Sequence, residues 1–248
     1  MDETIRKTKN SFEAAFADPY HYNKQTRDSA HLESILNFLH LKDGDRVLDL
    51  GTGGGYLSFA IAEKYPRVTV TGFDIVSDAL EFNKQKARER NMNNITFVSY
   101  DGIYNPFENE TFDCVATRYA LHHFPDIQHC FDEVSRVLVK GGRFFISDPT
   151  PNEDDCDGFV DAYMQLLDDG HRKFYTLAEF TMLANNAGME FAESYDSSIT
   201  FACKINKTYY DLFDNTSEDM LKSYCVNIDG DKCYITEKVV NVVFRKNN

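Results

Sequence analysis

The fold of this chain is decided by the stretch Arg46-Val-Leu-Asp-Leu-Gly-Thr-Gly-Gly-Gly-Tyr-Leu-Ser-Phe-Ala-Ile-Ala62. An apolar run that contains an acid, residues 47–50, meets a cluster of four glycines, and apolar residues at helical spacing follow at once. This pattern predicts a buried strand, a tight turn and the start of a helix, the first half of a βαβ unit. Glycines suit the turn because the backbone must bend sharply and let a ligand approach without a Cβ in the way. The following helix offers free N–H groups at its N-terminus.

Three kinds of ligand are compatible with a glycine turn, and the surrounding residues separate them. A Walker phosphate loop ends in Gly-Lys-Ser/Thr, and no lysine lies between residues 46 and 64, which argues against this class. A dinucleotide loop reads G-x-G-x-x-G/A, but the sixth position counted from Gly51 is Tyr56, so an NAD-dependent oxidoreductase is disfavoured. The pattern present, Asp-x-Gly-x-Gly-x-Gly over residues 49–55, resembles motif I of the class I S-adenosylmethionine-dependent methyltransferases.

Composition narrows the class of protein. The chain has 248 residues and a mass of 28.5 kDa, which fits one domain with a full-sized core. Its net charge of −14 argues against binding to nucleic acid and favours a small neutral or cationic ligand. None of the six cysteines forms C-x-x-C, so we expect reduced thiols in a cytoplasmic protein. The charged N-terminus has no apolar signal region, and no apolar run approaches the roughly 20 residues of a membrane span.

Acids follow the next two predicted strands. Residues 68–74 read as a strand that ends in Asp74, and a carboxylate at such a strand end can accept both hydroxyls of a ribose. This feature alone does not separate NAD from S-adenosylmethionine. Residues 94–100 read as a third strand, followed by Asp101 and Gly102. This pair resembles the adenine-binding position of the methyltransferase family, although Asp-Gly is also a common turn.

Longer segments strengthen the resemblance. TFDCVATRYALHHFPD (residues 111–126), EVSRVLVKGGRFFISD (133–148) and TLAEFTMLANNAGMEFAES (176–194) are similar to the ubiquinone/menaquinone-biosynthesis-type methyltransferases and their small-molecule relatives. The resemblance implies an α/β, Rossmann-like class I methyltransferase sandwich. Its sheet is expected to be mostly parallel and seven-stranded, with order 3-2-1-4-5-7-6 and the last strand, residues 237–246, antiparallel.

We expect a single methyltransferase domain over residues 1–248, built from a core and a helical cap. Apolar and aromatic residues outside the core segments predict helices over the carboxyl ends of the strands, where open α/β sheets bind ligands. Tyr20, Tyr22 and Arg27 either fold over the ligand mouth or form an ordinary surface group. The core is expected at about 41–150, 176–203 and 236–248, and the cap at 1–40, 151–175 and 204–235.

The resemblance also implies residue roles toward S-adenosylmethionine. The glycine turn lines the methionine and ribose portion, Asp49 helps to hold the α-amino group, and Arg118 borders the methionine end. Asp74 takes the ribose hydroxyls, and the segment from Asp101 packs against the adenine. The expected cofactor residues are therefore Asp49, Gly51, Thr52, Gly53, Asp74, Ile75, Asp101, Gly102, Ile103 and Arg118.

Two histidines follow the fourth predicted strand. His122 or His123 is a candidate general base for an acidic C–H, O–H or N–H acceptor, or both belong structurally to the turn before Pro125. No metal site is expected, because adjacent side chains on a strand point to opposite faces. Tyr119 either offers a π face to the sulfonium or packs in the interior.

The predicted function is methyl transfer from S-adenosylmethionine to a small-molecule acceptor by direct in-line displacement, with S-adenosylhomocysteine as product. Displacement needs the nucleophile about 3–3.5 Å from the methyl carbon and aligned with its C–S bond. The strand-four segment reads Thr-Arg-Tyr-Ala, not Asn-Pro-Pro-Tyr, which argues against the base- and glutamine-methylating branch. The alternative is an S-adenosylmethionine-binding sensor or scaffold without transfer activity. A homodimer is left open.

Overall fold

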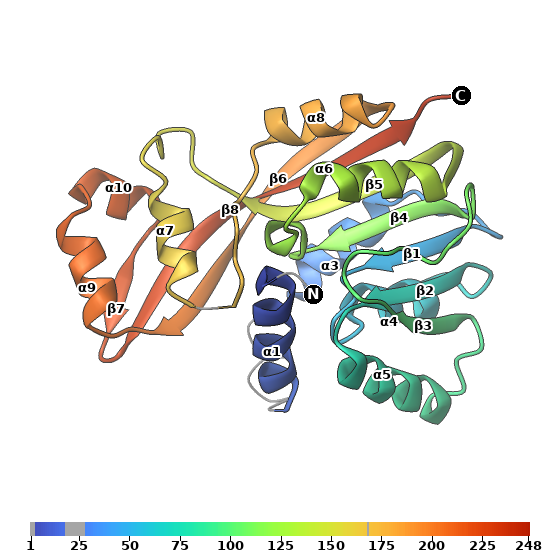
Figure 1. The fold of residues 1–248 in the computed structure, drawn as a ribbon, viewed down its shortest axis with the longest axis horizontal. Helices are drawn as coiled ribbons and strands as arrows, with labels where there is room; N and C mark the ends of the chain where they lie inside the picture. The colour runs from blue at the N-terminus through green and yellow to red at the C-terminus, as the bar shows by residue number, and fades with distance from the viewer. Residues whose placement is uncertain (1–2, 18–27, 168) are drawn as a thin grey trace.

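A twisted sheet runs through the whole molecule (Figure 1). The computed structural model describes residues 3–17, 28–167 and 169–248. Its strands follow the apolar, β-branched runs of the sequence, because such side chains pack well on a pleated surface. The strands are β1 Arg46–Leu50, β2 Thr69–Asp74, β3 Ile95–Ser99, β4 Phe112–Arg118, β5 Leu138–Thr150, β6 Met189–Lys204, β7 Asn227–Asp229 and β8 Lys232–Lys246.

The strand order is β3-β2-β1-β4-β5-β8-β6. The first five strands pair in parallel, whereas β8 pairs antiparallel with both β5 and β6. With β8 as the seventh strand of the expected sheet, this arrangement confirms the predicted order and the antiparallel last strand. The short strand β7, which pairs with β8, was not predicted.

Helices cover both faces of the sheet. Neighbouring residues on a strand point to opposite faces, so Phe144 packs with α6 and α8, while Phe145 packs with α3 and α4. Both faces are therefore buried, as expected for parallel strands. The helices are α1 Glu3–Ala17, α3 Ser29–Phe38, α4 Tyr56–Lys64, α5 Ser77–Glu89, α6 Ile127–Val137, α7 Phe159–Gln165, α8 Leu177–Asn186, α9 Lys207–Asp214 and α10 Glu218–Ser223, with a 3-10 turn at Leu121–His123.

A separate apolar cluster forms at one end of the sheet. There β6 and β8 extend beyond the other strands, and α7, α9 and α10 gather around them, at the left of Figure 1. The helices expected between the last two strands are present, but residues 227–235 form a β-hairpin, which corrects that part of the prediction. The division into core and cap stays a prediction.

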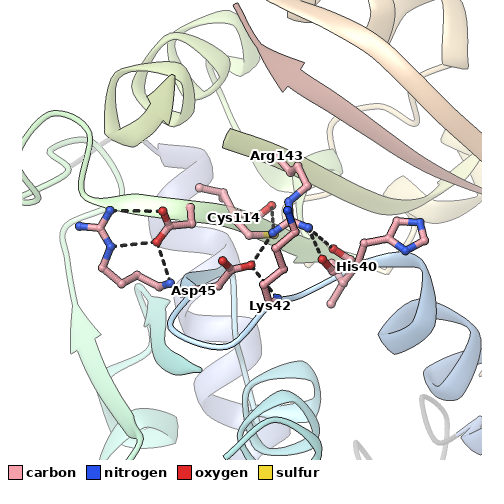
Figure 2. Close-up of polar contacts among 9 residues, drawn as sticks. His40, Lys42, Asp45, Cys114 and Arg143 are labelled. Atoms are coloured by element: carbon pink, nitrogen blue, oxygen red, sulfur yellow. Dashed lines mark hydrogen bonds and ion pairs between the residues drawn. The ribbon is translucent and has the colours of Figure 1, made fainter. Parts of the chain in front are cut away.

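Arg143 fixes the opposite end of the sheet, where the strands begin (Figure 2). Its guanidinium donates hydrogen bonds to the carbonyls of Leu39 (2.9 Å) and His40 (2.5 Å), just past the end of α3. It also donates to the carboxylate of Asp45 at 2.5 Å, directly before β1. One side chain of β5 thus ties α3 to the first strand.

Two expectations concern the remaining parts of the chain. The predicted positions Tyr20, Tyr22 and Arg27 lie outside the described residues. None of the helices within residues 3–17, 28–167 and 169–248 has both the length and the apolar character of a membrane span.

Candidate active site

The glycine turn lies at the carboxyl end of β1, between β2 and β4. The amides of Gly51 and Thr52 both donate to the carbonyl of Phe73, at 2.8 and 3.2 Å. Gly51, Gly53 and Gly55 have φ angles of +73°, +49° and +78°, a region that glycine enters without strain. A Cβ on Gly51 would lie 2.5 Å from that of Ala120, so the turn also needs glycine for its close approach to the chain after β4.

Asp49 stabilises the glycine turn through hydrogen bonds to its side chain. Its Oδ2 accepts hydrogen bonds from the Thr52 hydroxyl (2.7 Å), the Ser58 hydroxyl (2.6 Å) and the Ser58 amide (3.0 Å). Burial raises the pKa of the Asp49 carboxyl, while the bonds from Ser58 and Thr52 act in the opposite direction. The unusual acid in the apolar strand is thus accounted for by an internal network that fixes the start of α4.

Asp74 joins the turn to the end of β2. One carboxylate oxygen accepts from the Gly53 amide at 2.8 Å, and the other accepts from the Val76 amide at 2.9 Å. Burial raises the pKa of this carboxyl. Since a carboxylate can accept about four hydrogen bonds, Asp74 retains acceptor capacity for a ligand hydroxyl. Asn83, buried on α5, donates to the Gly53 carbonyl at 2.8 Å and holds the turn from the other side.

A cleft of about 690 Å³, including its open mouth, lies over the strand ends. Ile5, Thr8 and Phe12 of α1 form one of its walls. The structure brings seven of the predicted site residues to this main cleft, namely Gly51, Gly53, Asp74, Ile75, Gly102, Arg118 and His123.

A side cavity adjoins the main cleft on the far side of the glycine turn. Asp49 and Thr52 line this cavity. Gly51, Arg118 and Tyr119 line both spaces, so the two adjoin at these residues. Asp49 and Thr52 therefore line the side cavity, whereas Gly53 and the residues after β2 and β3 line the main cleft.

The segment after β3 differs from the expectation in one respect. The Asp101 carboxylate accepts from the amides of Ile103 (2.9 Å) and Tyr104 (2.8 Å), and these bonds lower its pKa. Its side chain thus stabilises its own loop, and Ile103 is exposed beside a neighbouring cavity. Tyr100 lines the main cleft instead, with its ring stacked on Phe73 at 4.1 Å. The roles of Asp101 and Ile103 toward adenine stay predictions.

Two side chains mark the junction of the two spaces. The guanidinium of Arg118 lies over the rings of Tyr56 (4.3 Å) and Tyr119 (3.9 Å). Tyr119 has a φ angle of +54°, an uncommon conformation for a bulky residue, and its amide donates to Ser147. Strained backbone conformations of this kind concentrate at functional sites. Here the conformation belongs to Tyr119, whose side chain lines the main cleft.

The two histidines occupy different environments. His123 lines the main cleft, and its ring lies 5.3 Å from that of Phe12. His122 points away from the cleft lining, with its Nδ1 2.8 Å from the Asp148 carboxylate. Burial and the neighbouring His122 lower the pKa of His123 to about 3, and burial lowers the pKa of His122 well below its usual value. Both imidazoles are therefore neutral at pH 7. Among the described residues, no group of metal-type ligands could hold an ion.

Sequence reasoning missed several of these residues. Asn83 lies at helical spacing from Ala79 and Ala87 on the buried face of α5. A polar residue on an apolar helix face indicates a buried hydrogen-bonding role, so this pattern could have identified Asn83. Phe12 could not be placed, because its contact with the cleft joins segments about a hundred residues apart.

Comparison with known proteins agrees with this geometry. Residues 41–214 match the family described as "Methyltransferase domain". The chain is 28% identical over 188 residues to the uncharacterized methyltransferase YcgJ of Bacillus subtilis, covering 75% of this chain and 74% of that protein. The crystal structure of YcgJ superimposes with a TM-score of 0.76 at 22% identity, over 89% of this chain and all of the other.

Two further relatives indicate the breadth of the likeness. Demethylmenaquinone methyltransferase of Thermus thermophilus is 31% identical over 115 residues, covering 46% of this chain and 52% of that protein. A structure of geranyl diphosphate methyltransferase in complex with SAM has a TM-score of 0.64 at 19% identity, over 88% of this chain and 85% of the other.

The fold and the matched segment define the class. The chain belongs to the methyltransferase domain family, and it is an enzyme of the S-adenosylmethionine-dependent kind. The family resemblance expected from the glycine turn and the segment after β4 is thereby confirmed.

Proposed function

We propose that this protein binds S-adenosylmethionine along the main cleft and side cavity and transfers its methyl group to a small-molecule acceptor. The observation that carries the proposal is the meeting of three strand ends in one site. The glycine turn after β1, Asp74 after β2 and Arg118 after β4 line the same main cleft. Asp74 takes the ribose hydroxyls, and the methionine portion lies on the side of Asp49 and Arg118.

The remaining walls suit direct in-line displacement. α1 closes one side of the main cleft, and the ring of Tyr119 borders the position where the two spaces meet. An aromatic face favours a sulfonium cation. His123 is neutral and lines the cleft, and to act as a general base it would need its pKa raised from about 3 in the complex with ligands. His122, held by Asp148, positions this turn from behind.

A binding and a transfer measurement together test the proposal. S-adenosylhomocysteine should bind by calorimetry, and methyl-labelled S-adenosylmethionine should label a compound of low molecular weight in a cell extract. Binding without label in any fraction would instead support a sensor or scaffold. Absence of S-adenosylhomocysteine binding, with NADH producing a thermal shift, would overturn the cofactor assignment.

A further inference from the structure

Helix α1, dark blue in Figure 1, forms one wall of the main cleft with a single face. Ile5, Thr8 and Phe12 follow one another at intervals of three and four residues, so they share this face. Ile5 and Thr8 are buried, and the ring of Phe12 stands edge-on to that of His123, with the centroids 5.3 Å apart. Whatever fixes this face in place therefore also fixes the wall of the cleft.

Two glycines receive this face where it meets neighbouring loops. A Cβ on Gly170 would overlap the hydroxyl oxygen of Thr8 and would lie 3.1 Å from its amide nitrogen and 3.2 Å from its Cβ. A Cβ on Gly102 would lie 2.9 Å from Cγ2 of Ile5. Non-bonded heavy atoms prefer separations of about 3.5–4.0 Å. Helix α1 can thus lie where it does because neither loop carries a side chain at these points.

The loop that carries Gly170 is anchored on its other side. Nε2 of His171 lies 2.8 Å from the carboxylate of Asp161 on α7. The amide of Arg172 donates to the carbonyl of His122 at 2.8 Å. The loop would have to break these bonds in order to retreat, so a side chain added at position 170 should displace α1 instead.

The Thr8 hydroxyl does not strengthen this contact. Its oxygen is buried and has no hydrogen-bond partner among the described residues. Such a hydroxyl has lost its water without gaining a bond, so removing it should cost little stability. Rotation of the side chain would move the oxygen away from an alanine at position 170, but the backbone nitrogen and the Cβ of Thr8 would remain too close.

Gly170 itself does not border the ligand space. It is absent from the described linings of the main cleft, of the side cavity and of the cavity beside Ile103. Thr8, its contact on α1, does line the main cleft. An effect of position 170 on a bound ligand is therefore expected to pass through α1 and not through direct contact.

We propose that Gly170 is a positioning residue of this active site: it lets α1 lie against the main cleft, and α1 in that place slows the release of the bound cofactor. The inference rests on the proposed function, because S-adenosylmethionine is the ligand that α1 retains. Displacement of α1 opens one wall of the cleft while the glycine turn and Asp74 keep their places. The dissociation rate should therefore rise, and the association rate should not fall.

The test compares two glycines with similar backbone conformations. Gly170 and Gly158 have φ angles of +82° and +73°, so alanine strains the backbone similarly at both positions. A Cβ on Gly158 would have no described atom within 4 Å apart from its chain neighbours. Gly170→Ala should raise the dissociation rate of S-adenosylhomocysteine at least fivefold by stopped flow, and it should accelerate hydrogen exchange of the α1 amides at least tenfold. Gly158→Ala should change neither rate.

A second substitution tests whether the effect passes through Thr8. The double variant Gly170→Ala/Thr8→Ala lacks the overlapping oxygen, and its remaining close contacts require only a small shift of α1. Dissociation and α1 exchange should therefore return to within about twofold of the rates for Thr8→Ala alone. If Gly170→Ala is too unstable to purify, the double variant should still fold and show these rates.

The outcomes separate this inference from the proposed function. Equal effects of Gly170→Ala and Gly158→Ala, or a double variant that does not recover, overturn the inference and leave the proposed function intact. Failure of the unmodified protein to bind S-adenosylhomocysteine would overturn the proposed function and the retention role with it. The exchange measurement would then still show whether Gly170 positions α1.

Discussion

At the scale of single residues, Asp74 combines two tasks that can be separated experimentally. It accepts the Gly53 and Val76 amides and keeps further lone pairs for a ligand. Asp74→Ala should weaken S-adenosylhomocysteine binding by about 1.5–3 kcal/mol, roughly 10–150-fold, because hydrogen bonds to a charged group are lost. Calorimetry measures the change, with the exposed Asp78→Ala on the following helix as control. Equal affinity of both variants would remove Asp74 from the site.

Gly51 offers a sharper comparison, because a second glycine has nearly the same backbone. Gly51 and Gly188 have φ angles of +73° and +74°, so alanine brings similar backbone strain, about 1–2 kcal/mol, at either position. Only at Gly51 does the new Cβ meet another atom, at 2.5 Å from Ala120; at Gly188 none lies within 4 Å. We expect Gly51→Ala to lower S-adenosylhomocysteine affinity more than tenfold and Gly188→Ala to leave it unchanged. Similar losses of affinity in both variants would show that the effect comes from reduced stability alone.

Residue identities in the site were predictable where local sequence determines them. Gly51, Gly53 and Asp74 belong to a strand-turn-helix pattern whose chemistry is visible within a few residues, and the structure places them together. Glu237 was not predictable as a buried acid, and Phe12 was not predictable as a residue of the cleft. An acid inside a strand pattern looks like an exposed position until its neighbours are known, and no periodicity shows which cleft an amphipathic helix will cover.

At the scale of secondary-structure elements, the connection between α3 and β1 depends on Arg143. Its guanidinium binds two carbonyls after α3 and the Asp45 carboxylate, and the side chain is only 14% exposed. Arg143→Met keeps the apolar stem and should lower the free energy of unfolding by about 1.5–3 kcal/mol. Urea denaturation measures this change.

Arg245 provides the matched control for Arg143. It lies directly opposite Arg143 in the β5–β8 pair but is exposed. Arg245→Met should therefore change stability by less than about 0.5 kcal/mol. Equal effects of the two substitutions would show that the Arg143 contacts do not stabilise the fold, since only position 143 ties two elements together.

Element boundaries were predictable in the parallel half of the sheet and less so at its other end. Strands β1 to β4 each combine a short apolar run with a turn signal, and they lie where the sequence placed them. The β7–β8 hairpin was missed although Asp229-Gly230 is a recognised hairpin signal. The aromatic residues between 209 and 224 favoured the interpretation of the whole segment 204–235 as helical. Their partners in α7 come from a distant segment, so the apolar cluster is visible only in three dimensions.

At the scale of the whole molecule, buried ionisable groups make opposite contributions to the pH dependence of the free energy of unfolding. Burial lowers the pKa values of His122 and His123, so the folded protein binds fewer protons than the unfolded chain below about pH 6.5. These histidines therefore destabilise the fold as the pH falls through that range. Burial raises the pKa of Glu237 to about 8, which has the opposite effect, because the folded protein then binds more protons than the unfolded chain.

Glu237→Gln should isolate the second of these effects. Below about pH 4.5 the carboxyl is protonated in both states, and between about pH 4.5 and 8 only the unfolded chain ionises. Unfolding then releases a proton, so wild-type stability falls with rising pH by up to about 1.4 kcal/mol per unit from this group. The variant lacks this dependence, and its stability relative to wild type should increase by at least about 1 kcal/mol between pH 5 and pH 8 in urea denaturation. Glu190→Gln, an exposed control on the neighbouring strand, should show no such trend. A difference between wild type and Glu237→Gln that stays constant with pH would mean that Glu237 ionises normally in the folded protein.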